Sequence, residues 1–177
     1  MDTKLKGDIA EQAAILQALK RGWGVLKTIG DRLPYDLVFD VDSVLVRVQV
    51  KSAWFQEADD AYVVDNRRTK TNRRIMKRSL YESKDFDFAL VYLEELSLFY
   101  VFPVDVFIEY GSQIYLVESG KRQRRPRSAI YRDAWDLISN GLHTRKLVCD
   151  HLSKSGNPHA AEIPSQASVQ TEEGVET

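Results

Sequence analysis

The segment that most constrains the fold is residues 86–93, FDFALVYL, an almost unbroken run of apolar, β-forming residues. A strand with apolar residues on both sides is covered on both faces, which is typical of the interior of a sheet in an α/β or α+β protein. The chain of 177 residues is long enough for one domain with a hydrophobic core. We therefore predict a mixed β-sheet flanked by helices.

Other segments supply the remaining elements of that fold. A helix is predicted over residues 4–20, where apolar residues recur at helical spacing, and Gly22 would end it. A tight turn at residues 40–43 would join two of the predicted strands. Strands are predicted at residues 25–29, 33–41, 44–52, 61–65, 98–102 and 113–118. A short helix or a turn is predicted at residues 103–110, and a further helix at residues 128–140.

Positive charge is concentrated in two blocks of the sequence. Residues 67–78, RRTKTNRRIMKR, contain seven Lys or Arg and no acid, and residues 121–132, KRQRRPRSAIYR, contain six. Like charges at this density repel one another unless an anionic partner neutralises them, which favours a surface that follows nucleic-acid phosphates. A solvated loop or a disordered linker is the alternative for either block. The residues expected to bind phosphates are Arg67, Arg68, Lys70, Arg73, Arg74, Lys121, Arg122, Arg124, Arg125 and Arg127.

The last part of the chain differs from the rest in composition. Residues 153–177 are rich in Ser, Pro, Gly, Gln and Glu, and residues 150–177 hold five acids against one Lys. A segment of this kind buries too little apolar surface to offset the entropy lost on ordering. We therefore expect one domain over residues 1–152 and a disordered acidic tail over residues 153–177.

The composition also excludes several classes of protein. No apolar run approaches the roughly 18 residues that a transmembrane helix requires, and the first residues, MDTKLKGDIAEQ, lack the apolar core of a secretion signal. The one cysteine, Cys149, cannot form a disulfide within the chain, and with three scattered histidines it does not make a zinc site. We therefore expect a protein of the reducing cytoplasm with no membrane partner.

Candidate functional residues lie on the predicted strand 44–52. Polar and apolar residues alternate along residues 46–51, VRVQVK. Because successive side chains of a strand point to opposite faces, Arg47, Gln49 and Lys51 share one face and three valines share the other. One face of this strand is therefore predicted to be polar, and the other to pack on the core.

The turn before this strand decides which residue of the preceding strand lies opposite it. If Asp40 and Ser43 close a two-residue loop, Asp36 pairs with Arg47 across the hairpin. Directly opposed residues point to the same side of a sheet, so Asp36 joins the polar face. A carboxylate, an amide and an ammonium would then meet on one strand pair. The solvated face of an edge hairpin gives the same pattern and is the alternative explanation.

Residues 34–36, PYD, followed by residues 49–51, QVK, resemble the PD-(D/E)XK nuclease motif, with Gln49 where an acid is usual. Residues 7–11, GDIAE, are similar to the first helix of that superfamily, which commonly supplies a further acid, here Glu11. Together with the basic blocks and the small size, these features resemble the group I intron-encoded homing endonucleases of the PD-(D/E)XK class, which occur in cyanobacterial transfer-RNA introns.

That resemblance implies a restriction-endonuclease-like fold, site-specific cleavage of both strands of a long DNA target, and assembly into a homodimer or a homotetramer. It implies Mg²⁺ held by Asp36, the side-chain carbonyl of Gln49, the backbone carbonyl of Val50, and Glu11, either directly or through water. Lys51 would orient or activate the attacking water. The implied catalytic residues are Glu11, Asp36, Gln49 and Lys51, and the basic blocks would hold the DNA backbone.

Other functions are compatible with the same residues. Holliday-junction resolvases and DNA-repair nucleases share the helix and hairpin pattern. A non-catalytic DNA-binding protein would keep the basic blocks without needing the polar strand face. The amide of Gln49 adds a dipole without a net charge, so we expect weaker metal binding than with an acid, and it could also mark an enzyme that has lost its activity.

Overall fold

The computed structural model describes residues 2–30, 32–72, 75–120 and 126–140. The predicted acidic tail at residues 153–177 lies outside them. No helix within the described ranges has both the length and the hydropathy that a membrane span requires. The predicted DNA-binding residues Arg73, Arg74, Lys121, Arg122, Arg124 and Arg125 also lie outside the described residues.

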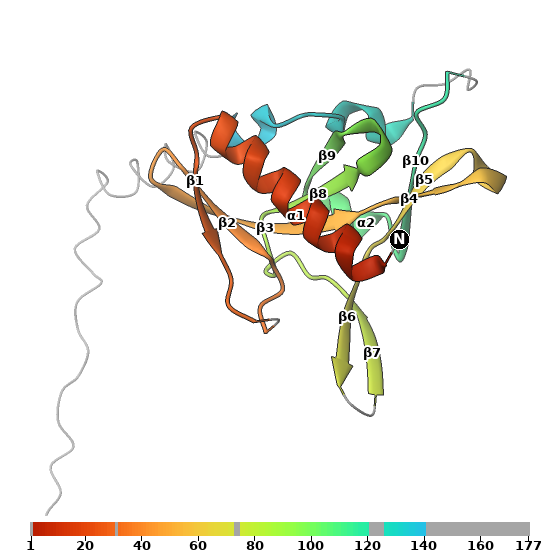
Figure 1. Cartoon of the computed structure of the whole chain (residues 1–177), viewed down its shortest axis with the longest axis horizontal. Coiled ribbons are helices and arrows are strands. Elements are labelled where there is room, and N and C mark those ends of the chain that lie inside the picture. Colours follow the sequence, from red (N-terminus) through yellow and green to blue (C-terminus); the bar gives the residue numbers. More distant parts are fainter. Residues whose placement is uncertain (1, 31, 73–74, 121–125, 141–177) are drawn as a thin grey trace, which may run out of the picture. The chain divides into compact units, whose positions relative to one another are not determined.

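Among the described residues, five strands form a central mixed sheet in the spatial order β1-β2-β3-β8-β9 (Figure 1). β3 and β8 are parallel, and the other neighbours are antiparallel. The predicted interior strand is β8, which lies between β3 and β9 and is buried from residue 89 to residue 93. The strands are β1 (Gly24–Lys27), β2 (Leu37–Val41), β3 (Val44–Ser52), β8 (Phe88–Leu93) and β9 (Leu98–Pro103).

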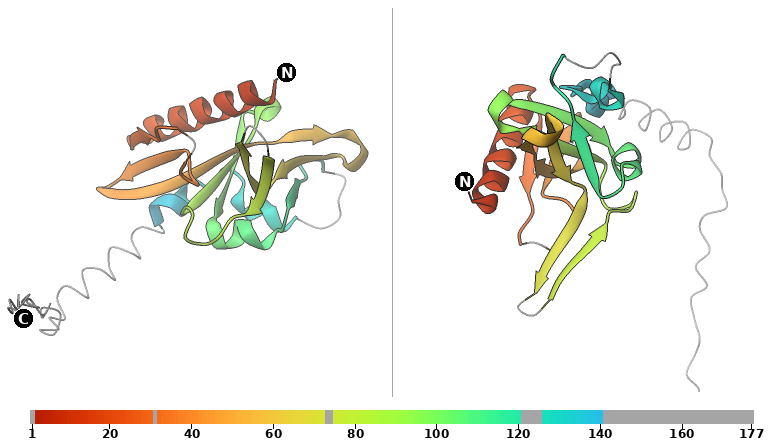
Figure 2. Two further views of the ribbon diagram at one scale, coloured as in Figure 1. Left: turned by 90° about the horizontal axis from the view of Figure 1, so that it is seen from below. Right: turned by 90° about the vertical axis from the view of Figure 1, so that its right-hand side faces the viewer.

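Helices cover both faces of this sheet (Figure 2). The first helix, α1, spans Thr3–Lys20, and the carboxylate of Asp2 caps it by accepting a hydrogen bond from the N–H of Lys4 at 3.2 Å. Gly22 follows the helix with a left-handed φ of +74°, which glycine adopts without strain. The short helix α2, Val104–Glu109, packs on the opposite face of the sheet, in a separate apolar cluster.

The inward face of α1 is made of small residues. Its buried residues are Ala10, Ala14 and Ala18, each 0% exposed, and they pack against the valines of β3. The larger side chains of Leu5 and Leu16 face solvent and are about half exposed, at 48% and 52%. The helix therefore approaches the sheet through methyl groups.

The remaining strands form two smaller units. β4 (Trp54–Gln56), β5 (Ala61–Asp65) and β10 (Gln113–Leu116) make a three-stranded sheet in the order β10-β5-β4 among the described residues. β6 (Arg67–Asn72) and β7 (Ile75–Leu80) make a separate antiparallel hairpin, which extends away from the central sheet (Figures 1 and 2). The first basic block therefore lies on a β-hairpin, instead of the solvated loop or disordered linker that was the alternative to a phosphate-binding surface.

The β2–β3 hairpin is present, but its predicted register was wrong by two residues. Val41 pairs with Val44, so the loop consists of Asp42 and Ser43, both with left-handed φ, at 50° and 66°. Such a loop matches the twist of the two strands, as type I′ turns do. The residue opposite Arg47 is consequently Val38, and Asp36 is displaced toward Gln49.

The predicted helix over residues 128–140 is also wrong. A 3₁₀ turn, η3, spans Arg127–Tyr131, the chain is then extended at Arg132, and residues 136–140 are helical. The backbone N–H of Asp133 donates to the carbonyl of Phe99 at 2.7 Å, and Arg132 forms a β-bridge with Tyr100. This segment hydrogen-bonds to the open edge of β9, because the unpaired backbone N–H and C=O groups of an edge strand can pair with another stretch of chain.

Candidate active site

Asp36 lies immediately before β2 and opposite the polar face of β3. Its N–H donates to the carbonyl of Val48 at 3.0 Å, which continues the hairpin pairing by one position. Its Oδ2 accepts hydrogen bonds from the Nε2 of Gln49 at 2.6 Å and from the N–H of Val50 at 2.8 Å. The predicted contact between Asp36 and Gln49 is therefore present despite the wrong register, because a shift of two residues keeps each side chain on its face.

Arg47 does not join this group, although the sequence placed it there. Its guanidinium forms an ion pair with Asp87, with 3.2 Å between Nε and Oδ2, and its N–H donates to the same Oδ2 at 2.8 Å. Asp87 precedes β8, so this pair ties the β3 strand to the neighbouring strand. The polar face is thereby divided into a structural ion pair and the group around Asp36.

The carboxyl group of Asp36 is held in an environment that disfavours its charge. Burial is the largest influence and raises its pKa to about 6, while the hydrogen bond from Val50 opposes this shift. The carboxylate of Glu11 raises the pKa further, and Lys51 and Lys27 lower it. A carboxyl group with a pKa near neutrality, in a cleft beside two lysines, is typical of a functional site.

The donor atoms around Asp36 suit a hard cation. The Nε2 of Gln49 lies 2.6 Å from the carboxylate of Asp36 and 3.1 Å from the backbone carbonyl of Val50. Rotating this amide by half a turn would direct its oxygen toward the same two oxygens, and the two orientations differ only in the assignment of N and O. Carboxylate, amide and backbone oxygens are the ligands that Mg²⁺ prefers, so these residues fit a Mg²⁺ site.

A metal at this site would depend on neutral oxygen donors as well as on acids. Within the described ranges, no three Asp, Glu, His or Cys side chains are grouped as a metal site would require. The second acid, Glu11, is bonded through Oε2 to the Nζ of Lys27 at 2.8 Å, so it faces a lysine of β1 in this structure. A cation that uses Glu11 would have to take the place of that ammonium.

Lys51 lies beside Asp36 with its ammonium held from two sides. Its Nζ donates to the backbone carbonyl of Arg67 at 2.9 Å and lies 5.1 Å from the centre of the Tyr81 ring. Burial lowers its pKa, while Asp36 and Asp65 partly offset that effect. The lysine is thus fixed by the first residue of the β6–β7 hairpin, a contact that residue spacing could not predict.

These groups open into one cavity of about 240 Å³. Arg68 and Tyr81 belong to its lining, and neither was predicted to do so; Arg68 was expected to contact phosphates on the surface. Its Nη2 donates to the backbone carbonyl of Arg32 at 2.7 Å. The basic block at residues 67–78 is the sequence signal that indicated a cation, but it could not show that Arg68 lines this cavity. The cavity is lined by Gly30, Leu33, Tyr35, Asp36, Gln49, Lys51, Arg68 and Tyr81.

The other predicted DNA-binding residues that the structure describes have varied surroundings. The Arg67 guanidinium is paired with Asp65, at 2.8 Å between Nε and Oδ1. Arg127 forms an ion pair with Glu109 and lies over the ring of Tyr110. The backbone of Lys70 is in β6, opposite Lys77. The structure thus brings Arg67 and Arg68 to the site, whereas Arg127 is engaged elsewhere.

Comparisons with known proteins agree with this geometry. Residues 1–138 match the family model described as PD-(D/E)XK endonuclease. The solved structure entitled "The structure of a bacterial homing endonuclease: I-Ssp6803I" is similar to this chain, with a TM-score of 0.77 and 66% sequence identity over 82% of this chain and 99% of that one. A search of curated proteins found no match. The restriction-endonuclease-like fold expected from the motif is confirmed by this structural similarity. The chain belongs to the PD-(D/E)XK endonuclease family.

Proposed function

We propose that this chain is a homing endonuclease that cleaves both strands of double-stranded DNA at a long, specific target site, and that it acts in the cytoplasm. The observation that carries the proposal is the group formed by Asp36, Gln49 and Lys51 in an open polar cavity. The similarity to a solved bacterial homing endonuclease at 66% identity supports the class of target.

We assign Mg²⁺ to this site, held by Asp36, Gln49, the backbone carbonyl of Val50, and Glu11. When bound, it supplies an activated water and stabilises charge on the phosphate. Ionised Asp36 is the central ligand, which fits a carboxyl group whose pKa of about 6 leaves it charged at neutral pH. Gln49 supplies a neutral donor, so the site gains less charge than one with three acids would.

The lysine and arginine of the cavity act on the phosphate. The Lys51 ammonium stands beside Asp36 and orients the attacking water or offsets charge that develops on the phosphate oxygens. Arg68 is a second cation facing the same space. The β6–β7 hairpin and the second basic block supply backbone contacts to the duplex, which give affinity without sequence information.

We propose that the active form is a homodimer or a homotetramer. The described residues hold one such site per chain, and cutting two strands at once requires two copies. Gel filtration with light scattering, in the presence and absence of target DNA, measures the number of chains. A strictly monomeric complex that cuts both strands in one binding event would contradict this part of the proposal.

A cleavage assay tests the proposed function. The purified protein is incubated with linear DNA that spans the insertion point of its own gene, with Mg²⁺ or with Ca²⁺ as a control. Cleavage at one position with Mg²⁺ alone is expected. Binding without cleavage under any divalent cation would support a non-catalytic DNA-binding protein instead, and preference for a four-way junction over the linear site would support a resolvase.

A further inference from the structure

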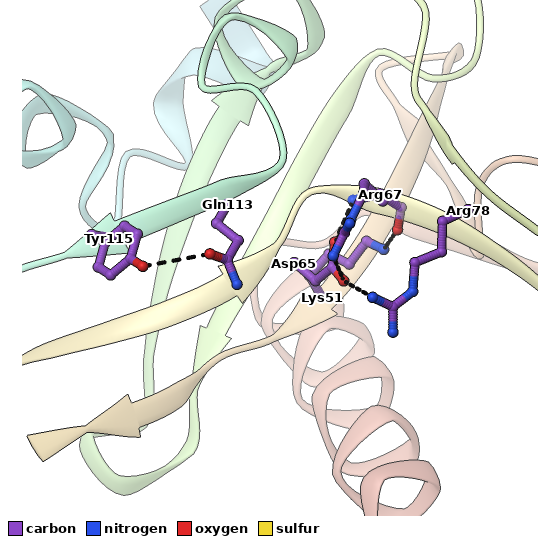
Figure 3. Close-up of polar contacts among 6 residues, drawn as sticks. All are labelled: Lys51, Asp65, Arg67, Arg78, Gln113 and Tyr115. Carbon is purple, nitrogen blue, oxygen red and sulfur yellow. Dashed lines mark hydrogen bonds and ion pairs between the residues drawn. The ribbon is translucent and has the colours of Figure 1, made fainter. Parts of the chain in front are cut away.

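The last residue of β5 is an acid that lies outside the predicted catalytic group and is linked to Lys51 through Arg67. Asp65 ends β5, and Arg67 begins β6. The backbone carbonyl of Arg67 accepts the hydrogen bond from the Nζ of Lys51 at 2.9 Å. Figure 3 shows the three residues together at the start of the hairpin. The position of that carbonyl therefore depends on how the chain is held between residues 65 and 67.

Asp65 holds this part of the chain with both oxygens of its carboxylate. Its Oδ1 accepts hydrogen bonds from the backbone N–H of Arg67 at 3.0 Å and from the Nε of Arg67 at 2.8 Å. Its Oδ2 accepts one from the Nη2 of Arg67 at 3.0 Å and lies 3.9 Å from the Nη1 of Arg78. The side chain of one acid thus binds the backbone and the side chain of Arg67 and reaches across to β7 (Figure 3).

The charge state of Asp65 is suited to this role. Burial pulls its pKa upward, but the hydrogen bonds from the side chain and the backbone of Arg67 outweigh burial and lower the pKa overall. The carboxylate remains ionised, and charged acceptors form the shorter and stronger hydrogen bonds. A short acid that accepts from the N–H two residues later also fixes a turn of the backbone.

We propose that Asp65 is a positioning residue for the reaction, which acts by fixing the backbone carbonyl of Arg67 and, through it, the ammonium of Lys51. The inference rests on the proposed endonuclease function. A lysine has four rotatable side-chain bonds, so it occupies one place in a site only where a fixed acceptor holds it. The Tyr81 ring bounds the ammonium on another side but supplies no directional acceptor.

The experiment separates cleavage rate from DNA affinity in two variants at this position. Asp65→Ala removes every contact, whereas Asp65→Asn keeps an oxygen that can accept the N–H of Arg67. Single-turnover cleavage is measured with enzyme in excess over DNA and with Mg²⁺, and binding is measured with Ca²⁺. We expect Asp65→Ala to cut about 10- to 100-fold more slowly at saturation, with a Kd within about fivefold of the wild type, because the effect is on orientation. Asp65→Asn is expected to recover most of the rate.

Asp59→Ala is the matched control. Asp59 is an exposed acid in the 3₁₀ turn that precedes β5, whereas Asp65 ends that strand, and its Oδ2 accepts a hydrogen bond from the Nε2 of Gln56 at 2.5 Å. This variant loses an acid and a side-chain hydrogen bond away from the carbonyl that holds Lys51, and it is expected to bind and to cut DNA as the wild type does. Thermal melting of each variant establishes that it is folded, and if Asp65→Ala does not fold, Asp65→Asn and Asp65→Ser are compared, since both retain an acceptor of different reach.

The possible outcomes distinguish this inference from the function on which it rests. A wild-type protein that cuts no DNA would contradict the proposed function itself. If the wild type cuts and Asp65→Ala cuts equally fast, only the positioning role is wrong. Equal loss of rate in Asp65→Ala and Asp65→Asn would mean that the charge matters and the backbone hydrogen bond does not, which also overturns the proposal. An equally large loss of rate in Asp59→Ala would do the same.

Discussion

Two antiparallel hairpins of this molecule, β2–β3 and β6–β7, are held in place in different ways. The β2–β3 hairpin packs one face on the core, where Leu37, Phe39 and Val48 are fully buried. The described side chains of β6–β7, such as Arg68 and Arg78, are half-buried or exposed. The hydrophobic effect fixes the first hairpin, whereas polar contacts at its base fix the second. The rigid hairpin therefore provides the candidate catalytic groups, and the exposed one provides positive charge for the duplex.

The largest effect is expected from the rigid hairpin. Asp36→Ala and Lys51→Ala should each slow cleavage by about 1,000-fold or more, because each removes a group that would face the reacting phosphate. DNA binding in Ca²⁺ should remain within about tenfold of the wild type, since the basic residues are unchanged. Single-turnover cleavage and fluorescence anisotropy measure the two quantities. Wild-type cleavage by Asp36→Ala would remove this hairpin from the chemistry.

Arg68 tests where the two hairpins meet. Arg68 belongs to β6, but it lines the cavity that contains Asp36 and Lys51. We expect Arg68→Ala to lower the single-turnover rate about 10- to 100-fold, because a cation beside the phosphate is lost, and Arg68→Lys to restore part of it. Lys84→Ala is the control, since Lys84 lies outside both basic blocks and its exposed ammonium is paired with Glu82 at 2.6 Å. A change in affinity alone for Arg68→Ala would place it with the DNA-binding residues instead.

The ionised form of Asp36 is expected to support cleavage but to lower the free energy of unfolding. Its pKa is about 6 in the folded chain and 3.8 in the reference state, so protonation favours folding as the pH falls from about 6 to about 4. Above pH 6 the ionised group costs up to about 3 kcal/mol. Asp36→Asn should therefore raise the free energy of unfolding at pH 8, and the difference from wild type should shrink below pH 6. Urea denaturation at several pH values measures it.

The exposed hairpin should affect affinity and its salt dependence. Lys70 pairs with Lys77 in the β6–β7 ladder. We expect Lys70→Ala to weaken DNA binding a few-fold and to reduce the slope of log K against log salt by about 0.9, the value for one lost phosphate contact. The rate at saturation should not change. An unchanged salt slope would mean that this hairpin does not follow the DNA backbone.

The smallest effect is expected from the end of the chain. We propose that the catalytic domain ends near residue 152 and that residues 153–177 take no part in folding or cleavage. A chain that stops at residue 153 should match the full chain in melting temperature within about 2 °C and in cleavage rate within about twofold, because acidic, polar segments bury little surface. A large loss of activity would contradict this boundary.

The contrast between the hairpins also explains which structural predictions succeeded. Buried strands leave an apolar pattern in the sequence, which alternates along β3 and is almost continuous along β8, so both strands were predicted. The alternation in β3 also predicted the face that Gln49 and Lys51 share. A tight turn was predicted within residues 40–43, but its position at Asp42–Ser43 was not, because two consecutive left-handed residues that are not glycine leave only a weak sequence signal. The site was still found, since the error was an even number of residues.

Other features had no local signal. The β6–β7 hairpin was missed, because residues 67–78 are dominated by Lys and Arg and show no apolar alternation in the sequence. The helix expected at residues 128–140 was interrupted by hydrogen bonds from a strand about 30 residues earlier, as between Phe99 and Asp133. The contacts of Lys51 with Arg67, and of Glu11 with Lys27, join distant parts of the chain in the same way.

The alanine face of α1 determines more than the packing of one helix. Ala10, Ala14 and Ala18 act as spacers of a single carbon between the helix axis and the sheet. Glu11 is a residue of α1, whereas Asp36 immediately precedes β2 of the central sheet. The size of those three side chains consequently sets the separation of the two acids, so each added methyl group would move Glu11, a proposed metal ligand, away from Asp36.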